Sequence, residues 1–288
     1  MVLPSSELVL CEAFDYPDGS VTTNSGSLWN RHSGTFGQMR VNGGVLKMLS
    51  GQTEDVNAQL VGAPYATNSG KTLFASFSVN FTTTPSVSGE YFAHFMDVGG
   101  NFRARVFGTT SNAPSGSFRL GIANNSSSLS NAIIHEANLS KDSIHTVVIS
   151  YNVSTGISTL WVDPTPESSP SVTASDTPAP SAIGSFAFRE NGGIGNLSVD
   201  DLKIGLTYAS VTGGAAPQPY LRINRTATGV EVSWPAGATD AGFAIQTSAT
   251  LGASADWHAP AQGTVRQGEN DIIRITSPAA NAFFRLRK

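Results

Sequence analysis

Carboxylates and histidines are the side chains that most often catalyse reactions in proteins, and here their spacing assembles no site within a single strand. Glu54-Asp55 and Asp200-Asp201 are pairs of adjacent acids. Neighbouring residues of a β-strand point to opposite faces, so neither pair can flank one sugar linkage from one strand. Glycoside hydrolases need two carboxylates that face the same bond, about 5–10 Å apart. We therefore predict no catalytic carboxylate pair.

The histidines are isolated from one another, and no His-x-His or His-Glu-x-x-His spacing predicts a zinc site. They are His32, His94, His135, His145 and His258. A Gly-x-Ser-x-Gly nucleophile elbow is absent, and Gly192-Gly193-Ile194-Gly195 lacks the lysine of a phosphate-binding loop. The sequence predicts no catalytic and no cofactor-binding residues, and structural or surface roles for the histidines.

Any site must be positioned by a chain that is rich in apolar residues and poor in charge. Hydrophobic residues make up 40% of the 288 residues and charged residues 13%, with 15 phenylalanines spread along the chain. Disordered segments lack such apolar material. The net charge of −4, with scattered basic residues, argues against nucleic acid as a partner. Cys11 is the only cysteine, so no internal disulfide is expected.

The sequence also bears on the cellular location. No run of about 18 apolar residues predicts a membrane-spanning helix. Residues 1–11 lack the basic region and the long apolar core of a signal peptide. If the protein is secreted, we expect its signal peptide to lie outside this sequence.

Short segments with alternating apolar residues predict β-strands through most of the chain. In Thr72–Phe81 every second residue from Leu73 onward is apolar, which is typical of a strand with one buried face. Asn152–Gly156 lies between two further strand segments and predicts a hairpin turn, because Gly156 can adopt a positive φ. Closely spaced strands without intervening helices favour antiparallel sheets that stack as a sandwich or jelly roll.

Two segments rich in proline or glycine interrupt the strand pattern. Asp163–Ser181 carries five prolines and predicts a surface loop, because proline cannot donate to a strand ladder. Val211–Pro219 predicts a linker. Short strands resume after it, and Trp234 lies in phase with Val230 and Val232, which alternate with polar residues, so it is expected to face a core. We predict a larger domain over residues 1–210, a linker over 211–219 and a smaller β-sandwich over 220–288.

Several motifs resemble known families. In the larger domain these are Glu12–Gly19, Trp29, Val45-Leu46, Leu160–Pro164 and Val199–Gly205. They resemble the laminin-G-like or concanavalin A-like jelly-roll domains of large secreted bacterial proteins, as in Verrucomicrobia and Planctomycetes. Val232–Pro235, Trp257 and Phe283–Leu286 are similar to the small immunoglobulin-like or fibronectin-III-like sandwich that often closes such chains. The resemblance implies an all-β fold, an antiparallel jelly-roll sandwich plus a smaller Ig-like β-sandwich.

Three carboxylates are candidates for a structural calcium site. If Leu202 and Ile204 face the core, Asp200 shares their face, and a buried carboxylate needs hydrogen-bond donors or a cation. In carbohydrate-binding jelly rolls a Ca²⁺ often joins the first and last strands through such an aspartate, and this resemblance implies Glu12 and Asp15 as the other ligands. The alternative is that Asp200 only accepts backbone N–H bonds.

The two ends of the larger domain are also expected to meet. We predict that Glu7–Phe14 lies beside Leu197–Ile204, because pairing the first and last strands removes an exposed sheet edge.

The resemblance, the low charge and the lack of a carboxylate pair imply a non-catalytic extracellular or cell-surface module that binds polysaccharide or another cell-surface component. Candidate aromatic residues for stacking on sugar rings are Trp29, Tyr65, Tyr91, Trp161, Tyr208 and Trp257. Two alternatives stay open. One is a structural subunit of a matrix, sheath or filament that self-associates through sheet contacts. The other is a polysaccharide-active enzyme with a site built from loops, although the Glu-x-Asp-x-x-Glu motif of related glucanases is absent.

Overall fold

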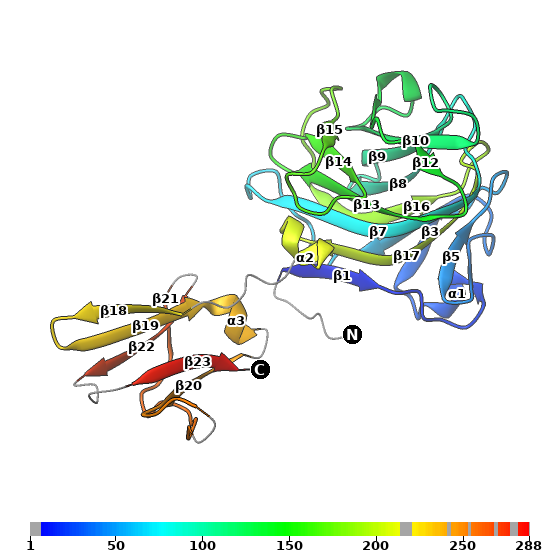
Figure 1. Cartoon of the computed structure of the whole chain (residues 1–288). Coiled ribbons are helices and arrows are strands. Elements are labelled where there is room, and N and C mark those ends of the chain that lie inside the picture. The colour runs from blue at the N-terminus through cyan, green and yellow to red at the C-terminus, as the bar shows by residue number, and fades with distance from the viewer. Residues whose placement is uncertain are drawn as a thin grey trace. The chain divides into compact units, whose positions relative to one another are not determined.

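The computed structural model describes residues 7–213, 221–240, 243–252, 255–267, 270–276 and 282–287 (Figure 1). Within these ranges the regular structure is mostly β-strand, and the helices are three to five residues long. The chain forms two compact units, residues 7–212 and 213–288, and each has its own apolar core. The all-β class that the alternation predicts is confirmed.

Two antiparallel sheets form the larger unit. The first sheet has the strand order β15 (Ser171–Thr173), β14 (Ser158–Val162), β13 (Ile144–Asn152), β7 (Thr72–Thr83), β17 (Asn196–Gly205), β5 (Val45–Met48), β4 (Arg40–Asn42) and β2 (Gly19–Ser20), and β1 (Leu8–Glu12) pairs with β17. The second sheet has the order β11 (Ile133–Ile134), β10 (Ser117–Ala123), β9 (Phe102–Thr109), β8 (Glu90–Asp97), β16 (Ile183–Arg189), β6 (Asp55–Gln59) and β3 (Trp29–Ser33), and β12 (Leu139–Ser140) pairs with β10. The larger unit also contains three short helical turns, α1 (Val21–Asn24), η1 (Leu129–Asn131) and α2 (Tyr208–Thr212).

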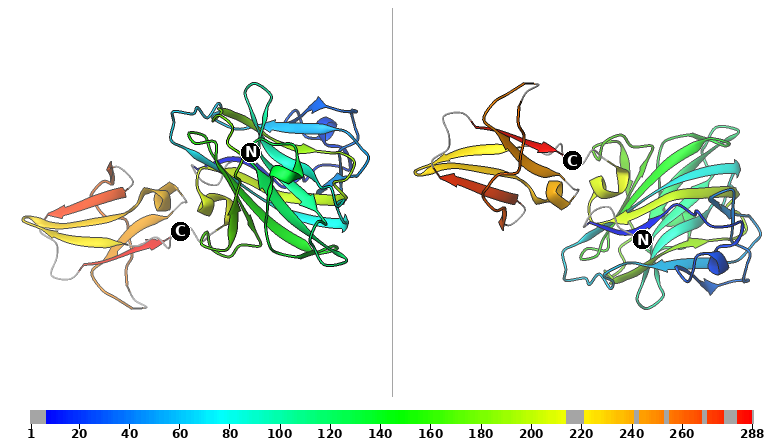
Figure 2. Two further views of the ribbon diagram at one scale, coloured as in Figure 1. Left: turned by 90° about the horizontal axis from the view of Figure 1, so that it is seen from above. Right: turned by 90° about the horizontal axis from the view of Figure 1, so that it is seen from below.

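The two sheets stack through a core rich in phenylalanine. On β7 the apolar set that begins at Leu73 and ends at Phe81 is buried as the alternation predicts, but Phe74 and Ser76 on the other face are buried as well. Phe77 contacts Phe92, Phe186 and Phe188 of the second sheet at ring-centroid distances of 6.4, 6.2 and 5.7 Å. Tilted and edge-to-face contacts at such distances stabilise a core beyond simple burial. Figure 2 shows the strands of the two layers from above and below.

The first and last strands of the larger unit pair, which confirms the predicted closure. β1 runs antiparallel to β17, with Leu10 opposite Ile204 and Glu12 opposite Leu202. The pairing covers an edge that would otherwise present free backbone donors and acceptors.

A β-bulge in β17 overturns the expected orientation of Asp200. Just after Asp200 the strand carries one residue more than the facing stretch of β7, and Asp201 adopts a φ of 53°. An extra residue shifts the alternation of a strand, so Val199 is buried before the bulge and Leu202 after it. The expectation that Asp200 shares the face of Leu202 and Ile204 is therefore wrong, and its side chain is half-buried on the other face.

The predicted hairpin is confirmed, and the predicted proline-rich loop is confirmed in part. β13 and β14 form the expected antiparallel hairpin, with Gly156 at a φ of 73° in the turn. Asp163–Ser181 is mostly loop, but it also contains the short edge strand β15. Proline flanks β15 without interrupting it, which fits the position of a strand with only one partner.

The smaller unit contains two further antiparallel sheets. One has the order β18 (Arg222–Thr226), β19 (Gly229–Pro235), β22 (Asn270–Thr276) and β21 (Val265–Gln267), and the other pairs β20 (Ala244–Ser248) with β23 (Phe283–Arg287). Trp234 is buried with Val232 and Ile273, as predicted. Its indole N–H donates to the hydroxyl of Thr239 in α3 (Ala236–Asp240) at 2.9 Å.

Candidate functional site

The three carboxylates of the predicted calcium site lie near one another but in different environments. Glu12 is buried, and its Oε1 accepts a hydrogen bond from the backbone N–H of Phe14 at 2.7 Å. Its Oε2 accepts from the Tyr16 hydroxyl at 2.6 Å and from the Trp29 indole at 3.0 Å. Three donors are enough to compensate a buried carboxylate without a cation. Burial and the contact with Glu12 in turn raise the pKa of Tyr16.

Asp15 is exposed, whereas Asp200 is half-buried and accepts a 2.7 Å hydrogen bond from the N–H of Asp201. Burial raises the pKa of Asp200, and the nearby charges of Asp201, Asp15 and Glu12 add to that effect. In the part of the chain that the structure describes, no group of three or more acids, histidines or cysteines is arranged to hold a metal ion. Glu12 acts here as a hydrogen-bonded anchor between β1 and β3, and calcium at this place stays a prediction.

A second group of acids surrounds the start of β6. Glu54 and Glu190 are buried, and so is Asp55. Glu54 accepts from the N–H of Met39 at 2.7 Å, and Glu190 accepts from the N–H of Leu49 at 3.0 Å. Burial raises the pKa of Asp55 to about 6 and that of Glu190 to about 7, and the charge of Glu54 contributes to both shifts. Sequence reasoning identified the Glu54-Asp55 pair but not Glu190, which joins it from more than a hundred residues away.

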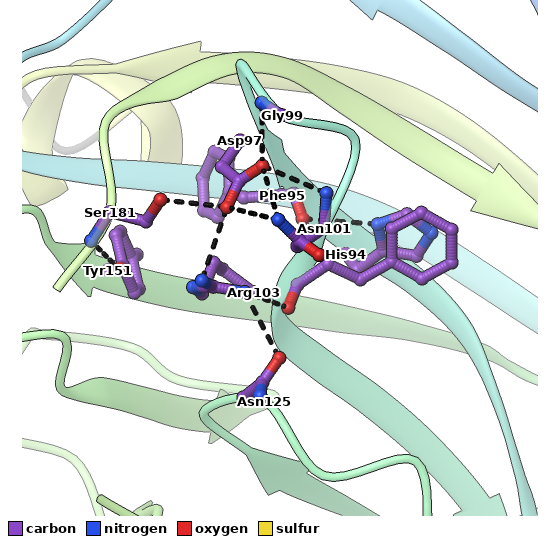
Figure 3. Close-up of polar contacts among 10 residues, drawn as sticks. His94, Phe95, Asp97, Gly99, Asn101, Arg103, Asn125, Tyr151 and Ser181 are labelled. Carbon is purple, nitrogen blue, oxygen red and sulfur yellow. Dashed lines mark hydrogen bonds and ion pairs between the residues drawn. The ribbon is translucent and has the colours of Figure 1, made fainter. Parts of the chain in front are cut away.

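A buried ion pair closes one end of the sandwich (Figure 3). Arg103 of β9 contacts Asp97 of β8 at 3.1 Å, and both side chains are buried. Asp97 also accepts from the Ser181 hydroxyl at 2.7 Å and from the N–H groups of Gly99 and Asn101 at 2.9 and 2.8 Å. The network therefore ties the end of the proline-rich loop to the turn between β8 and β9.

The charges of this network are compensated within the protein. Burial alone would raise the pKa of Asp97, but hydrogen bonds from Ser181 and Asn101 and the charge of Arg103 more than offset it, so the pKa lies below 3.8. Arg103 further donates to Asn125 and to the carbonyl of Phe102, each at 3.0 Å. A carboxylate and a guanidinium held in this way stabilise the loop end and leave little for a ligand to satisfy.

The outer face of the second sheet, which points away from the main core, has a different composition. Tyr91 and Phe107 form a separate apolar cluster there with Ala123. Directly opposed residues cross this face from Tyr91 on β8 to Phe107 on β9, Gly121 on β10 and Ile134 on β11. We call one set of side chains on this face the arginine–aromatic cluster: His32, Tyr91, His94, Phe102, Arg105 and Arg189.

Two guanidinium groups of this cluster contact the same ring. The guanidinium carbon of Arg189 lies 4.1 Å from the ring centroid of Tyr91, and that of Arg105 lies 4.6 Å from it and 5.2 Å from the centroid of Phe102. Arg189 is paired with Glu90 at 3.1 Å and with Asp55 at 3.9 Å. Arg105 has no ion pair among the described residues, and its buried Nε has no hydrogen-bond partner. Burial lowers the pKa of Arg105.

The two histidines of the cluster are neutral near pH 7. His94 is fully buried, and its ring stacks on Phe102 at a centroid distance of 3.9 Å. Its Nδ1 lies 3.1 Å from the carbonyl of Phe95, which assigns the proton to Nδ1 and leaves Nε2 without a partner among the described residues. Burial lowers the pKa of His94 and of His32; the nearby Asn57 partly offsets the effect on His32, although its geometry is not that of a hydrogen bond. A histidine with no exposed surface supports the packing of the cluster rather than contact with a ligand.

A groove of about 450 Å³ lies at the β11 end of the same face. We call it the serine groove, and its lining is Ser88, Ser111, Asn112, Arg119, Ser128, Leu129, Ser130 and Ile134. Leu129 also packs against the cluster of Tyr91 and Phe107, so the groove adjoins the arginine–aromatic cluster. The lining contains hydroxyls, an amide, a guanidinium and two aliphatic side chains, and no carboxylate.

The other predicted aromatic candidates lie elsewhere. Trp29 belongs to the main core. Trp161 and Tyr208 pack with Phe74 on the first sheet, beside a hollow of about 430 Å³ that includes Lys71 and Glu167 in its lining. Both rings are buried, as is that of Tyr91, so none of the three offers much surface for stacking on a sugar ring. Among the candidates, Tyr91 is the one that joins the arginine–aromatic cluster beside the serine groove.

Sequence reasoning missed the arginines and serines of this face. Phe102, Arg105 and Phe107 stand on one strand, and this mixture of rings and a cation on a predicted strand was an available indication. The serines come from three separate loops, and their spacing in the sequence carries no such indication.

No protein-family model and no curated protein sequence matches the chain. Similar solved structures include the carbohydrate recognition domain of Emp47p, with 11% identity, 70% of this chain and 97% of that chain covered, and a TM-score of 0.42. The CBM2 module of the evolved Dit of Lactobacillus casei BL23 phage J-1 has 13% identity, coverage of 70% and 96%, and a TM-score of 0.45. The PL7 alginate lyase AlyA1 from Zobellia galactanivorans has 12% identity, coverage of 72% and 97%, and a TM-score of 0.43. At such low identities and scores the ligand of this chain has to be inferred from its own side chains.

Proposed function

We propose that the protein is a non-catalytic binding module for polysaccharide, and that the serine groove with the adjoining arginine–aromatic cluster is its binding site. The observation that carries the proposal is the lining of the groove. Serine hydroxyls and the amide of Asn112 can exchange hydrogen bonds with sugar hydroxyls in both directions, and Leu129 and Ile134 offer apolar contact to the C–H face of a sugar ring.

The same lining argues against glycoside hydrolysis at this groove. That reaction needs an acid and a base or nucleophile on either side of the scissile bond, and none of the side chains that line the groove is a carboxylate. The unpartnered Nε2 of His94 on the same face could not serve as a general base there, because this side chain has no exposed surface. A binding role therefore fits the chemistry better than an enzymatic one.

An extracellular or cell-surface location accompanies this proposal, since polysaccharide ligands are found there. No helix of the described residues is long and apolar enough to cross a membrane. Self-association of the chain through its sheets is the alternative function, and it predicts assemblies in the absence of any glycan. Sedimentation of the full chain without ligand tests that alternative directly.

The test is binding of the full chain to a panel of soluble polysaccharides in affinity gels, followed by calorimetry for each polymer that retards it. Ser130 lies exposed at the rim of the groove, so Ser130→Trp places a large ring inside it. We expect this variant to lose at least tenfold in affinity. The matched control is Ser154→Trp, in the exposed turn between β13 and β14, which should bind like the parent protein.

Two results would overturn the proposal. One is the absence of binding to every polymer of the panel. The other is an equal loss of affinity in Ser130→Trp and Ser154→Trp, which would show that binding does not occur at the groove.

A further inference from the structure

The charge balance of the arginine–aromatic cluster points to the class of polysaccharide. Arg189 has two carboxylate partners, Glu90 and Asp55. Arg105 lies close enough to Arg189 for their charges to repel, and the positive charge of Arg103 adds to this repulsion. The acid near Arg105 is Asp176, and its carboxylate already accepts from the backbone N–H groups of residues 124–126. Among the described residues, the charge of Arg105 is therefore left without a carboxylate of its own.

Arg105 is also held in place before any ligand arrives. Its guanidinium is stacked over Tyr91 and Phe102, and such cation–π contacts fix a plane that would otherwise be mobile. The two Nη nitrogens make no hydrogen bond to a described residue and are not buried. A planar fork of free donors is the geometry that recognises a carboxylate or a sulfate through two parallel hydrogen bonds.

A second arginine that pairs with no acid of the described residues lies further along the same face. Arg119 of β10 lines the serine groove, and its Nε donates to the neutral amide of Asn138 at 2.7 Å. Residue 105 on β9 stands opposite Ala123, and Arg119 lies four residues before Ala123 on β10. At a rise of about 3.3 Å per residue the two arginines are roughly 13 Å apart along the strands, a span of a few sugar rings.

We propose that the polysaccharide bound at this face is anionic, and that Arg105 and Arg119 each hold one of its carboxylate or sulfate groups, an inference that rests on the proposed binding function. The serine groove contacts the uncharged part of the sugar chain between these groups. Both anions present oxygens that accept from a guanidinium, so the two arginines serve for either chemistry.

The experiment compares polymers that share a backbone and differ in charge. The full chain is titrated with polygalacturonate and with its fully methyl-esterified form, and separately with dextran sulfate and with dextran. We expect at least tenfold tighter binding to the charged member of one pair or of both, and the pair that responds identifies carboxylate or sulfate as the ligand group. Affinity for that member should fall as salt is raised.

Variants assign the effect to the two arginines. Arg105→Gln and Arg119→Gln should each weaken binding of the charged polymer about tenfold, as expected for the loss of a charged hydrogen-bonded contact. Arg40→Gln, at an exposed arginine of β4 on the first sheet, is the matched control and should bind like the parent protein. Thermal melts of each variant show whether the fold is retained.

The outcomes separate this inference from the function on which it rests. If charged and neutral members bind equally and Ser130→Trp still abolishes binding, the module binds polysaccharide and the anionic preference is wrong. If Arg40→Gln weakens binding as much as Arg105→Gln does, the attraction comes from overall charge, and the two arginines are not the site. If no polymer of either pair or of the wider panel binds, both proposals fall.

Discussion

Arg103 and Arg105 stand two residues apart on β9, yet they lie in opposite environments. Arg103 points into the closed end of the sandwich, where Asp97 pairs with it and Asn125 accepts from it. Arg105 points to the outer face, where its contacts are two aromatic rings. The cause is a bulge at Ala104, which adopts a φ of 52° and interrupts the register between β8 and β9. The same residue type on one strand thus has a structural role on one face and a proposed binding role on the other.

The comparison also shows what separates a structural network from a candidate site. Around Asp97 most of the hydrogen-bonding atoms of the charged side chains have a partner within the protein. Both Arg103 and Arg105 keep a buried Nε that has no partner among the described residues, and on the outer face the two histidines also keep buried nitrogen atoms of this kind. An unsatisfied polar atom in a folded protein costs free energy. The difference that bears on ligand binding is that the guanidinium of Arg103 is paired with Asp97, whereas that of Arg105 has no ion pair among the described residues.

The largest effect is expected when the satisfied network is broken. Asp97→Ala leaves the buried guanidinium of Arg103 without its carboxylate and orphans the N–H groups of Gly99 and Asn101. Breaking a buried ion pair from one side costs about 3–5 kcal/mol. Urea unfolding followed by circular dichroism measures this loss. A loss below about 1 kcal/mol would show that the pair contributes little, contrary to the comparison.

The bulge itself can be tested at Ala104. Ala104→Val places a β-branched side chain in a left-handed, fully buried position, and we expect a loss of about 2–4 kcal/mol from backbone strain and overpacking. Ala104→Gly is the matched control and should stay within about 1 kcal/mol, because relief of the strained φ offsets the lost methyl group. Equal stability of the two variants would mean that the conformation at residue 104 does not separate the two arginines.

The contribution of Asp97 to stability should change with pH in the direction opposite to the contributions of Asp55 and Glu190. The pKa of Asp97 is lowered, so its contribution to stability is present above the ordinary value of 3.8 and is lost as pH falls through the folded-state pKa. The pKa of Asp55 is raised to about 6 and that of Glu190 to about 7, so their contributions are present at acidic pH and are lost as pH rises through those values.

We therefore expect the Tm of the parent protein to fall by a few degrees between about pH 5 and about pH 8. Asp55→Asn and Glu190→Gln should each reduce that fall, because neither substituted side chain ionises. Asp97→Asn is the control: it lowers the Tm at both pH values and leaves the fall between them unchanged. An equal slope in all four proteins would contradict the raised pKa values.

The smallest effect on stability is expected at Arg105. Arg105→Met keeps an unbranched apolar side chain at this position, and it removes the guanidinium that lies over Tyr91 and has no ion pair among the described residues. The lost cation–π contact and the relieved desolvation are each about 1 kcal/mol and of opposite sign, so the free energy of unfolding should change by less than about 1 kcal/mol. A loss as large as that of Asp97→Ala would make Arg105 a structural residue and remove the basis of the comparison.

Much of the fold was predictable because it rests on local patterns. The alternation in Thr72–Phe81, the turn ending in Gly156 and the inward position of Trp234 follow from side-chain period and turn chemistry. The polar strand β6 was not predicted. Its Asp55, Asn57 and Gln59 lie on the outer face of the sheet, where Asp55 is nevertheless buried, and they mask the alternation of Val56 and Ala58. A strand with polar residues on its outer face and only two apolar residues on its inner face gives a weak alternation of apolar and polar residues.

The candidate site was much less predictable than the fold. Tyr91 was among the aromatic candidates, but nothing in the spacing of Tyr91, Arg105 and Arg189 indicates that their side chains meet. The calcium candidates also show that sequence spacing does not reveal a bulge. The single extra residue in β17 places Asp200 on the face opposite Leu202.

By itself the sequence determined the all-β class, the inward set of apolar residues on each strong strand and the pairing of the first strand with the last. Only the tertiary structure decided which charges are compensated, which side of Ala104 each arginine occupies and which loops bring their serines to one groove. The physical reason is that alternation is a property of neighbouring residues, whereas register, bulges and cross-strand contacts depend on strands that lie far apart in the chain.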